Sequence, residues 1–77
     1  MTTLTLDARN MLCPLPVIRT QDAAAGMRTG DCLEVFCTDH GALNDIPAWC
    51  RINGHELLEK QDLGTEVRLL IRISNEI

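Results

Sequence analysis

The stretch Leu6-Asp7-Ala8-Arg9-Asn10-Met11-Leu12-Cys13-Pro14-Leu15-Pro16-Val17 (residues 6–17) joins the first predicted strand to the first predicted helix. Residues 3–7 alternate, with Leu4 and Leu6 on one face, which predicts a strand with one buried side. From Pro14 to about Met27, apolar residues recur at helical spacing. Residues 8–12 are therefore predicted to connect a strand to a helix.

The predicted helix start places a cysteine at a special position. Proline suits the first helical residue because its missing N–H would be unpaired there, so Pro14 makes Cys13 the expected N-cap. Pro16 also lacks an N–H, which leaves Leu15 as the expected donor to the Cys13 sulfur. A helix start carries roughly +0.5 charge and lowers the pKa of a nearby thiol. Because the two prolines remove donors, we expect only a moderate lowering of the Cys13 pKa.

Cys13 has a plainer interpretation as well. Cysteines are often buried and inert, so Cys13 could be a small apolar residue ahead of a helix. Ser and Asp are better N-caps than Cys, however, so a cysteine at this position indicates chemistry. We therefore expect Cys13 to be a nucleophile, with Pro14, Leu15 and Pro16 shaping its surroundings.

The remaining elements complete a mixed fold. Residues 32–38 and 67–73 alternate as strands, and residues 57–60 form a third strand joined to the last one by a hairpin at 62–65. Asp45 as N-cap with Pro47 just inside predicts a helix over 46–52. The order β-α-β-α-β-β predicts an α+β two-layer sandwich, with two helices on one face of a four-stranded mixed sheet. With 77 residues, the chain is expected to be a single domain over residues 1–77.

Composition narrows the classes of function. The net charge of −4 and the dispersed Lys and Arg residues argue against direct binding of nucleic acid. The chain has neither an apolar run of membrane-spanning length nor a signal-peptide pattern, which predicts a cytoplasmic protein without membrane insertion. Its four cysteines are then expected to be reduced, and their spacing does not suit zinc. We expect no metal site.

Other candidate side chains have two interpretations each. Asp7 is expected to bond backbone amides with Arg9 in solvent, or else Arg9 adds positive potential near the thiolate. Cys37 and Cys50 are expected in the core, although Cys50 could be an accessory thiol. Cys32 lies on the opposite face of its strand and is expected to be more exposed. The two histidines are more typical of surface turns than of catalytic bases.

Residues 6–17 resemble the signature of the TusA/SirA family of small sulfur-transfer proteins, above all in the Cys-Pro-x-Pro element with its leading Leu-Asp. The resemblance covers nearly the whole chain. Asn10 stands where the family often has glycine, and both residues accept a left-handed backbone. The further matching positions are Met27, Gly30, Thr38-Asp39, Asp45-Ile46-Pro47-Ala48-Trp49-Cys50 and Gly54-His55-Glu56-Leu57.

The resemblance implies a sandwich similar to the C-terminal domain of translation initiation factor three, with no metal or organic cofactor. It implies that Cys13 accepts sulfane sulfur as a persulfide and relays it to an acceptor protein. Implied donors are cysteine desulfurases and rhodaneses, and implied acceptors are DsrE-type proteins. The pathways served by the family are tRNA thiolation, molybdenum cofactor maturation, and sulfur and thiosulfate metabolism.

Two other functions remain open on the sequence alone. The helix-start motif could be a docking epitope of a non-catalytic regulatory or protein-interaction module. RNA binding by analogy with the initiation-factor domain is weaker, because a shared fold does not determine function and the charge is unfavourable.

Overall fold

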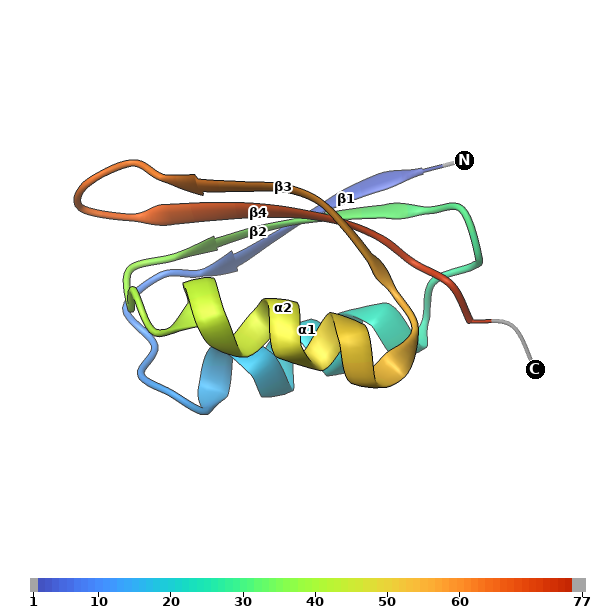
Figure 1. Ribbon diagram of the computed structural model, residues 1–77, viewed down its shortest axis with the longest axis horizontal. Coiled ribbons are helices and arrows are strands. Elements are labelled where there is room, and N and C mark those ends of the chain that lie inside the picture. The colour runs from blue at the N-terminus through green and yellow to red at the C-terminus, as the bar shows by residue number, and fades with distance from the viewer. Residues whose placement is uncertain (1, 76–77) are drawn as a thin grey trace.

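The computed structural model describes residues 2–75, and its two layers are plain in Figure 1. The elements follow in the order β1 (Thr3–Ala8), α1 (Leu15–Ala25), β2 (Cys32–Cys37), α2 (Ala42–Asn53), β3 (Glu56–Asp62) and β4 (Val67–Arg72). Both helices lie on the same side of the sheet (Figure 1). The predicted α+β class and the predicted order of elements are therefore confirmed.

The four strands form one mixed sheet in the order β1-β2-β4-β3. β1 pairs with β2 in parallel, whereas β4 pairs antiparallel with both β2 and β3. A parallel pair needs a crossover connection, and here α1 provides it. Because β1 and β2 run in the same direction, the segments that follow them meet at one end of the molecule.

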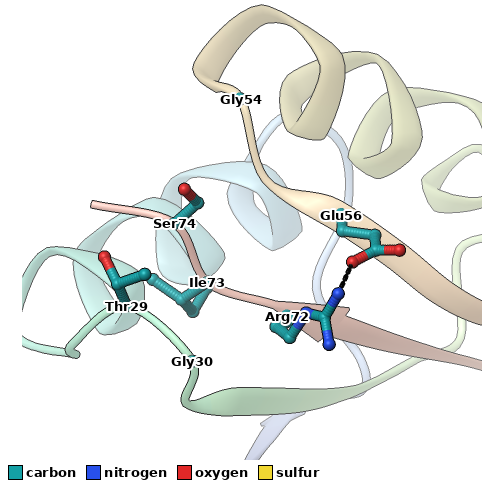
Figure 2. A pocket seen from close by; sticks show the side chains of 7 residues that line it. All are labelled: Thr29, Gly30, Gly54, Glu56, Arg72, Ile73 and Ser74. Carbon is teal, nitrogen blue, oxygen red and sulfur yellow. Dashed lines mark hydrogen bonds and ion pairs between the residues drawn. The ribbon is translucent and has the colours of Figure 1, made fainter. Parts of the chain in front are cut away.

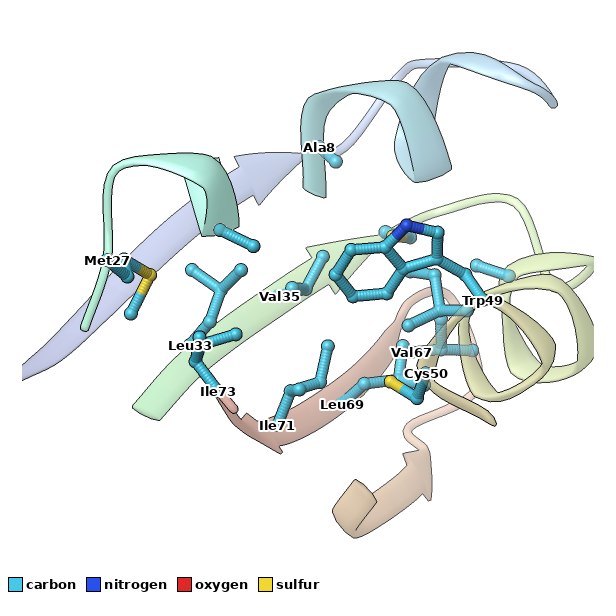
Figure 3. Close-up of a cluster of buried hydrophobic side chains, with 14 residues drawn as sticks. Ala8, Met27, Leu33, Val35, Trp49, Cys50, Val67, Leu69, Ile71 and Ile73 are labelled. Carbon is cyan, nitrogen blue, oxygen red and sulfur yellow. The ribbon is translucent and has the colours of Figure 1, made fainter. Parts of the chain in front are cut away.

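The core lies between the sheet and the helices and is drawn in Figure 3. The central strands contribute alternate residues that are almost completely buried, which explains their period of two. α2 contributes residues at helical spacing, so its apolar stripe faces the sheet. The main contributors are Leu33, Val35, Cys37, Ile46, Trp49, Cys50, Val67, Leu69, Ile71 and Ile73.

The second helix differs from the prediction at its start. α2 begins at Ala42, four residues earlier than predicted, and Pro47 lies inside it. A proline in a helix interior removes one N–H, so the carbonyl four residues earlier loses its usual partner. Burial of Ala42 and Ile46 against the sheet outweighs this local cost. The prediction that Asp45 caps this helix is wrong, because Asp45 lies within its first turn.

Charged side chains on the sheet face away from the helices are held in ion pairs. Arg68 donates from Nε to Glu34 at 2.6 Å and from Nη1 to Glu59 at 3.0 Å. Arg72 pairs with Glu56 across the β3–β4 pair. Side chains of opposite charge on neighbouring antiparallel strands stabilise a sheet. Pairing within the sheet therefore accounts for these charged side chains.

Candidate functional site

Two loops meet where the parallel strands end (Figure 1). The segment after β1 leads to Cys13, and the segment after β2 contains Thr38 and Asp39. The Asn10 N–H donates to Thr38 Oγ1 at 2.8 Å, and the Cys13 N–H donates to Asp39 Oδ2 at 2.9 Å. These two hydrogen bonds fix the backbone of Cys13 relative to the second loop.

Asp39 also connects this site to α2. Its Oδ1 accepts the N–H of Gly41, the N-cap residue of α2, at 2.9 Å. The hydrogen bonds from Gly41 and then from Cys13 hold the pKa of the Asp39 carboxyl below its ordinary value. One carboxylate therefore joins the cysteine segment to the start of the second helix.

The Cys13 side chain is exposed and contacts a second carboxylate. Its Sγ donates to Asp45 Oδ2 at 3.1 Å. This hydrogen bond, together with partial desolvation of the sulfur and the negative charges of Asp45 and Asp39, raises the pKa of the Cys13 thiol. A hydrogen bond to the protonated form favours that form, so the free protein holds Cys13 as a thiol.

The predicted lowering of the Cys13 pKa is therefore wrong, and the backbone shows why. The N-cap of α1 is Pro14 rather than Cys13, and the helix begins at Leu15. The Leu15 N–H, predicted to donate to the sulfur, instead donates to the Leu12 carbonyl at 2.9 Å. With that donor already engaged, the neighbouring carboxylates determine the ionisation of Cys13.

The residues that follow Cys13 divide between surface and core. Pro14 is exposed and Pro16 is buried, so the second proline anchors the start of α1. Leu12, Leu15 and Ile18 are exposed to 76%, 46% and 45%, although each is a large aliphatic side chain. Leu15 and Ile18 are three residues apart and lie on one side of the helix. We call these three residues the apolar rim of Cys13.

Asp7 and Arg9 lie together, on the side of the sheet that the helices do not cover. Asp7 Oδ1 accepts the Arg9 backbone N–H at 3.1 Å and its Nε at 2.9 Å. The Arg9 guanidinium also reaches Glu66 at 3.5 Å and lies 6.0 Å from the centre of the Phe36 ring. These partners account for the charge of Arg9 without Cys13.

The other three cysteines have different surroundings. Cys37 and Cys50 are buried, and burial raises the pKa of each to about 11. Their predicted place in the core is confirmed. Cys32 is half-buried on the other face of β2. Cys13 is therefore the one exposed thiol among the four.

Sequence reasoning missed that Asp39 and Asp45 contact Cys13. The signal for Asp39 was present, because parallel strands place their carboxyl ends together and Asp39 follows the second strand. The sequence instead predicts a helix cap at Asp45, because proline is typical of the first turn of a helix and Pro47 lies just beyond. The contact of Asp45 with Cys13 depends on the packing of α2 against the sheet, and no sequence pattern encodes that contact.

The other candidate sites in the structure contain fewer groups that could react or bind a ligand. A pocket of about 390 Å³ lies away from Cys13, and none of the predicted site residues lines it (Figure 2). Its Arg72 is paired with Glu56. His40 contacts Asp62 at 3.2 Å, and His55 packs beside the Trp49 ring. Among residues 2–75, no three acidic, His or Cys side chains gather as metal ligands would.

None of the helices among the described residues has the length and apolarity to cross a bilayer.

Comparison with known proteins agrees with the geometry. Residues 4–73 match the family model described as Sulfurtransferase TusA. The chain is 43% identical over 67 residues to the YrkI protein of Bacillus subtilis, covering 87% of this chain and 89% of YrkI. It is 36% identical over 69 residues to the sulfur carrier protein TusA of Allochromatium vinosum, covering 90% of this chain and 91% of that protein.

A solved structure has the same fold. The crystal structure of a SirA-like protein from Desulfitobacterium hafniense superposes with a TM-score of 0.76 at 24% identity, covering 94% of this chain and 96% of the other. The family match spans nearly all of the sheet and both helices. The chain therefore belongs to the TusA family of sulfur carrier proteins.

Proposed function

We propose that Cys13 accepts sulfane sulfur as a persulfide and passes it to the thiol of an acceptor protein. The observation that carries this proposal is the exposure of the Cys13 thiol, at the point where two ordered loops meet. The other thiols are less suited to the role, because Cys37 and Cys50 are buried and Cys32 is half-buried. A carrier thiol must be reached by the sulfur atoms of two partners in turn.

The apolar rim supports docking of protein partners beside this thiol. Leu12, Leu15 and Ile18 expose aliphatic surface that a lone soluble domain gains nothing by exposing. Buried by a partner, the same surface would stabilise the complex and bring a second sulfur to Cys13. We propose cysteine desulfurases or rhodaneses as donors and DsrE-type proteins as acceptors. The pathways proposed are tRNA thiolation, molybdenum cofactor maturation, and sulfur or thiosulfate metabolism.

A loading experiment tests the carrier function. The protein is incubated with a sulfur donor, and peptide mass spectrometry follows the gain of one sulfur atom, about 32 Da, on each cysteine. We expect the gain on the peptide that contains Cys13 and its loss in Cys13→Ser. Because Cys13 is exposed, the variant should keep the fold, which circular dichroism checks.

Two results would contradict the carrier function. Equal loading of the Cys13→Ser variant would mean that another thiol holds the sulfur. A cellular phenotype that Cys13→Ser rescues fully would favour the alternative, a non-catalytic interaction module in which the segment around Cys13 serves only for docking.

A further inference from the structure

The contact between Cys13 and Asp45 creates a difficulty for the reaction just proposed. A cysteine attacks sulfur as the thiolate, so the Cys13 thiol must first lose its proton. The thiolate would then lie beside the Asp45 carboxylate, whose Oδ2 is 3.1 Å from Sγ. A second carboxylate, Asp39, is bound to the backbone of the same cysteine. Like charges at such distances repel, so ionisation is opposed in the free protein.

The ion pairs of residues 2–75 involve neither of these two carboxylates. The salt bridges among residues 2–75 occupy other carboxylates, namely Asp7, Glu34, Glu56, Glu59, Asp62 and Glu66. Asp39 and Asp45 are absent from them, and the arginine closest in sequence, Arg9, is paired with Asp7 and Glu66. His40, the residue after Asp39, helps to lower the pKa of the Asp39 carboxyl. No ion pair in the described part of the chain neutralises Asp45, the carboxylate that contacts the Cys13 sulfur.

Asp45 is also held in place by the fold. It lies in the first turn of α2, and the next residue, Ile46, is completely buried in the core. The backbone of Asp45 therefore cannot move far from Cys13 without disturbing the helix, and its half-buried side chain is within reach of a visiting group.

We propose that Asp45 is a specificity-determining residue that makes Cys13 react preferentially with sulfur donors carrying a positive charge beside their reactive sulfur. The inference rests on the proposed carrier function of Cys13. A donor's ammonium or guanidinium group pairs with the Asp45 carboxylate, weakens its hold on the thiol proton and stabilises the sulfur anion. Anionic and neutral donors lack this interaction and meet a protonated thiol.

The chemical step is balanced without an oxidant or a reductant. Cys13 loses its thiol proton, and the thiolate attacks the outer sulfur of a donor persulfide, R–S–SH. A new bond forms between the two sulfur atoms as the S–S bond of the donor breaks. The departing thiolate, R–S⁻, takes up one proton, so Cys13–SH and R–S–SH become Cys13–S–SH and R–SH. Asp45 acts on the first part of this step, the ionisation.

Disulfide exchange with small probes tests the inference without a partner protein. Cystamine carries an ammonium group next to each sulfur, and its N,N′-diacetyl derivative is the matched neutral disulfide. Each is mixed with the Cys32→Ser protein at pH 7 and low salt, and mass spectrometry follows the mixed disulfide on Cys13. Both rates are divided by the rates of a short peptide with one cysteine, because the two leaving thiols differ in acidity.

We expect cystamine to react about fivefold faster than the neutral probe after this correction, since two opposite charges a few ångströms apart in water attract at this level. Added salt should reduce the preference. Asp45→Asn should abolish it and Asp45→Glu should retain much of it. Asp22→Asn is the matched control, because Asp22 is an exposed acid about 10 Å further along α1.

Two outcomes would overturn the inference. One is equal corrected rates for the two probes in the Cys32→Ser protein. The other is a preference for cystamine that survives in Asp45→Asn, since the selectivity would then arise elsewhere. Neither depends on persulfide loading. A protein that prefers cystamine but never gains sulfur on Cys13 would refute the carrier function and leave the charge selectivity standing.

Discussion

At the scale of single residues, the four cysteines differ because their surroundings differ. Cys37 and Cys50 face the core, where burial raises the pKa of each thiol to about 11 and keeps it unreactive. The pKa of Cys13 is raised for another reason, the carboxylates beside an exposed sulfur. Burial prevents access to a thiol, whereas a neighbouring carboxylate only opposes its ionisation. A partner's positive charge can offset a neighbouring carboxylate, but it cannot give access to a buried thiol.

Removal of the Asp45 charge should make Cys13 more acidic. In Asp45→Asn the thiol loses its hydrogen bond to a carboxylate and the repulsion of that charge, so the pKa of Cys13 falls. Because the thiolate is the reactive form, alkylation at pH 7 becomes faster. The measurement is the rate of iodoacetamide alkylation of Cys13 from pH 6 to 11. The same pH profile in the variant and the wild type would show that Asp45 does not control this ionisation.

At the scale of elements, the C-terminal ends of the two helices differ in whether they need a glycine. α2 ends at Gly54, whose φ of +79° is left-handed and whose N–H donates to the Cys50 carbonyl. α1 ends at Gly26, whose φ of −94° any residue can adopt. A glycine is required at the first of these positions and is optional at the second.

This pair of glycines gives a matched stability test. Gly54→Ala should lower the free energy of unfolding by about 1 kcal/mol, because a side chain is strained at positive φ although the space around it is open. Gly26→Ala should be neutral or slightly stabilising, because a Cβ added at Gly26 would lie 4.0 Å from the Ala23 carbonyl oxygen, an ordinary van der Waals contact. Urea unfolding measures both variants. Equal losses in the two would contradict the assignment of strain to Gly54.

At the scale of the whole molecule, the candidate site around Cys13 lies apart from the hydrophobic core. β1 and β2 stop at the same end of the molecule (Figure 1). The Cys13 N–H bonds to Asp39, which follows β2, and the Cys13 sulfur contacts Asp45 in the first turn of α2. The buried side chains lie between the layers, chiefly on β2, β4 and α2 (Figure 3). Changes at Cys13 and Asp45 therefore remove little core packing, and this is why they can be tested in a folded protein.

The stability of the whole domain should fall on both sides of neutral pH. The pKa values of Asp7, Asp31, Asp39, Asp62 and Glu34 are lowered by hydrogen bonds in the folded state. Their contribution is complete above about pH 4, the ordinary carboxyl range, and is lost as the pH falls through the lowered values.

The buried thiols give the opposite slope at alkaline pH. Cys37 and Cys50 keep their protons in the folded state until about pH 11, whereas unfolded cysteines ionise near ~8.5. Stability is therefore lost between these two values as the pH rises. The chain has no tyrosine, so no phenol ionises in this pH range. Urea unfolding from pH 2 to 11 measures both slopes, and Cys50→Ala should make the alkaline slope shallower. An unchanged slope in that variant would refute the assignment.

Much of this protein follows from the amino-acid sequence by itself. Alternation along residues 32–38 and 67–73 reports the buried faces of two strands, because successive side chains point to opposite sides. The Cys-Pro-x-Pro element marks the start of α1, because proline is tolerated there, and the family resemblance singles out Cys13. These features are local, so a linear pattern is enough to reveal them.

Tertiary structure alone decided the ionisation of Cys13 and the start of α2. Asp45 is 32 residues from Cys13 in the chain. Their contact exists only because α2 packs on β3 and β4 and beside α1, the helix that follows Cys13. The same packing keeps Pro47 inside a helix, where local preference would end it. Many residues contribute to the free energy gained by burying apolar side chains. Their sum can therefore exceed the local cost of one unfavourable residue, such as a proline inside a helix.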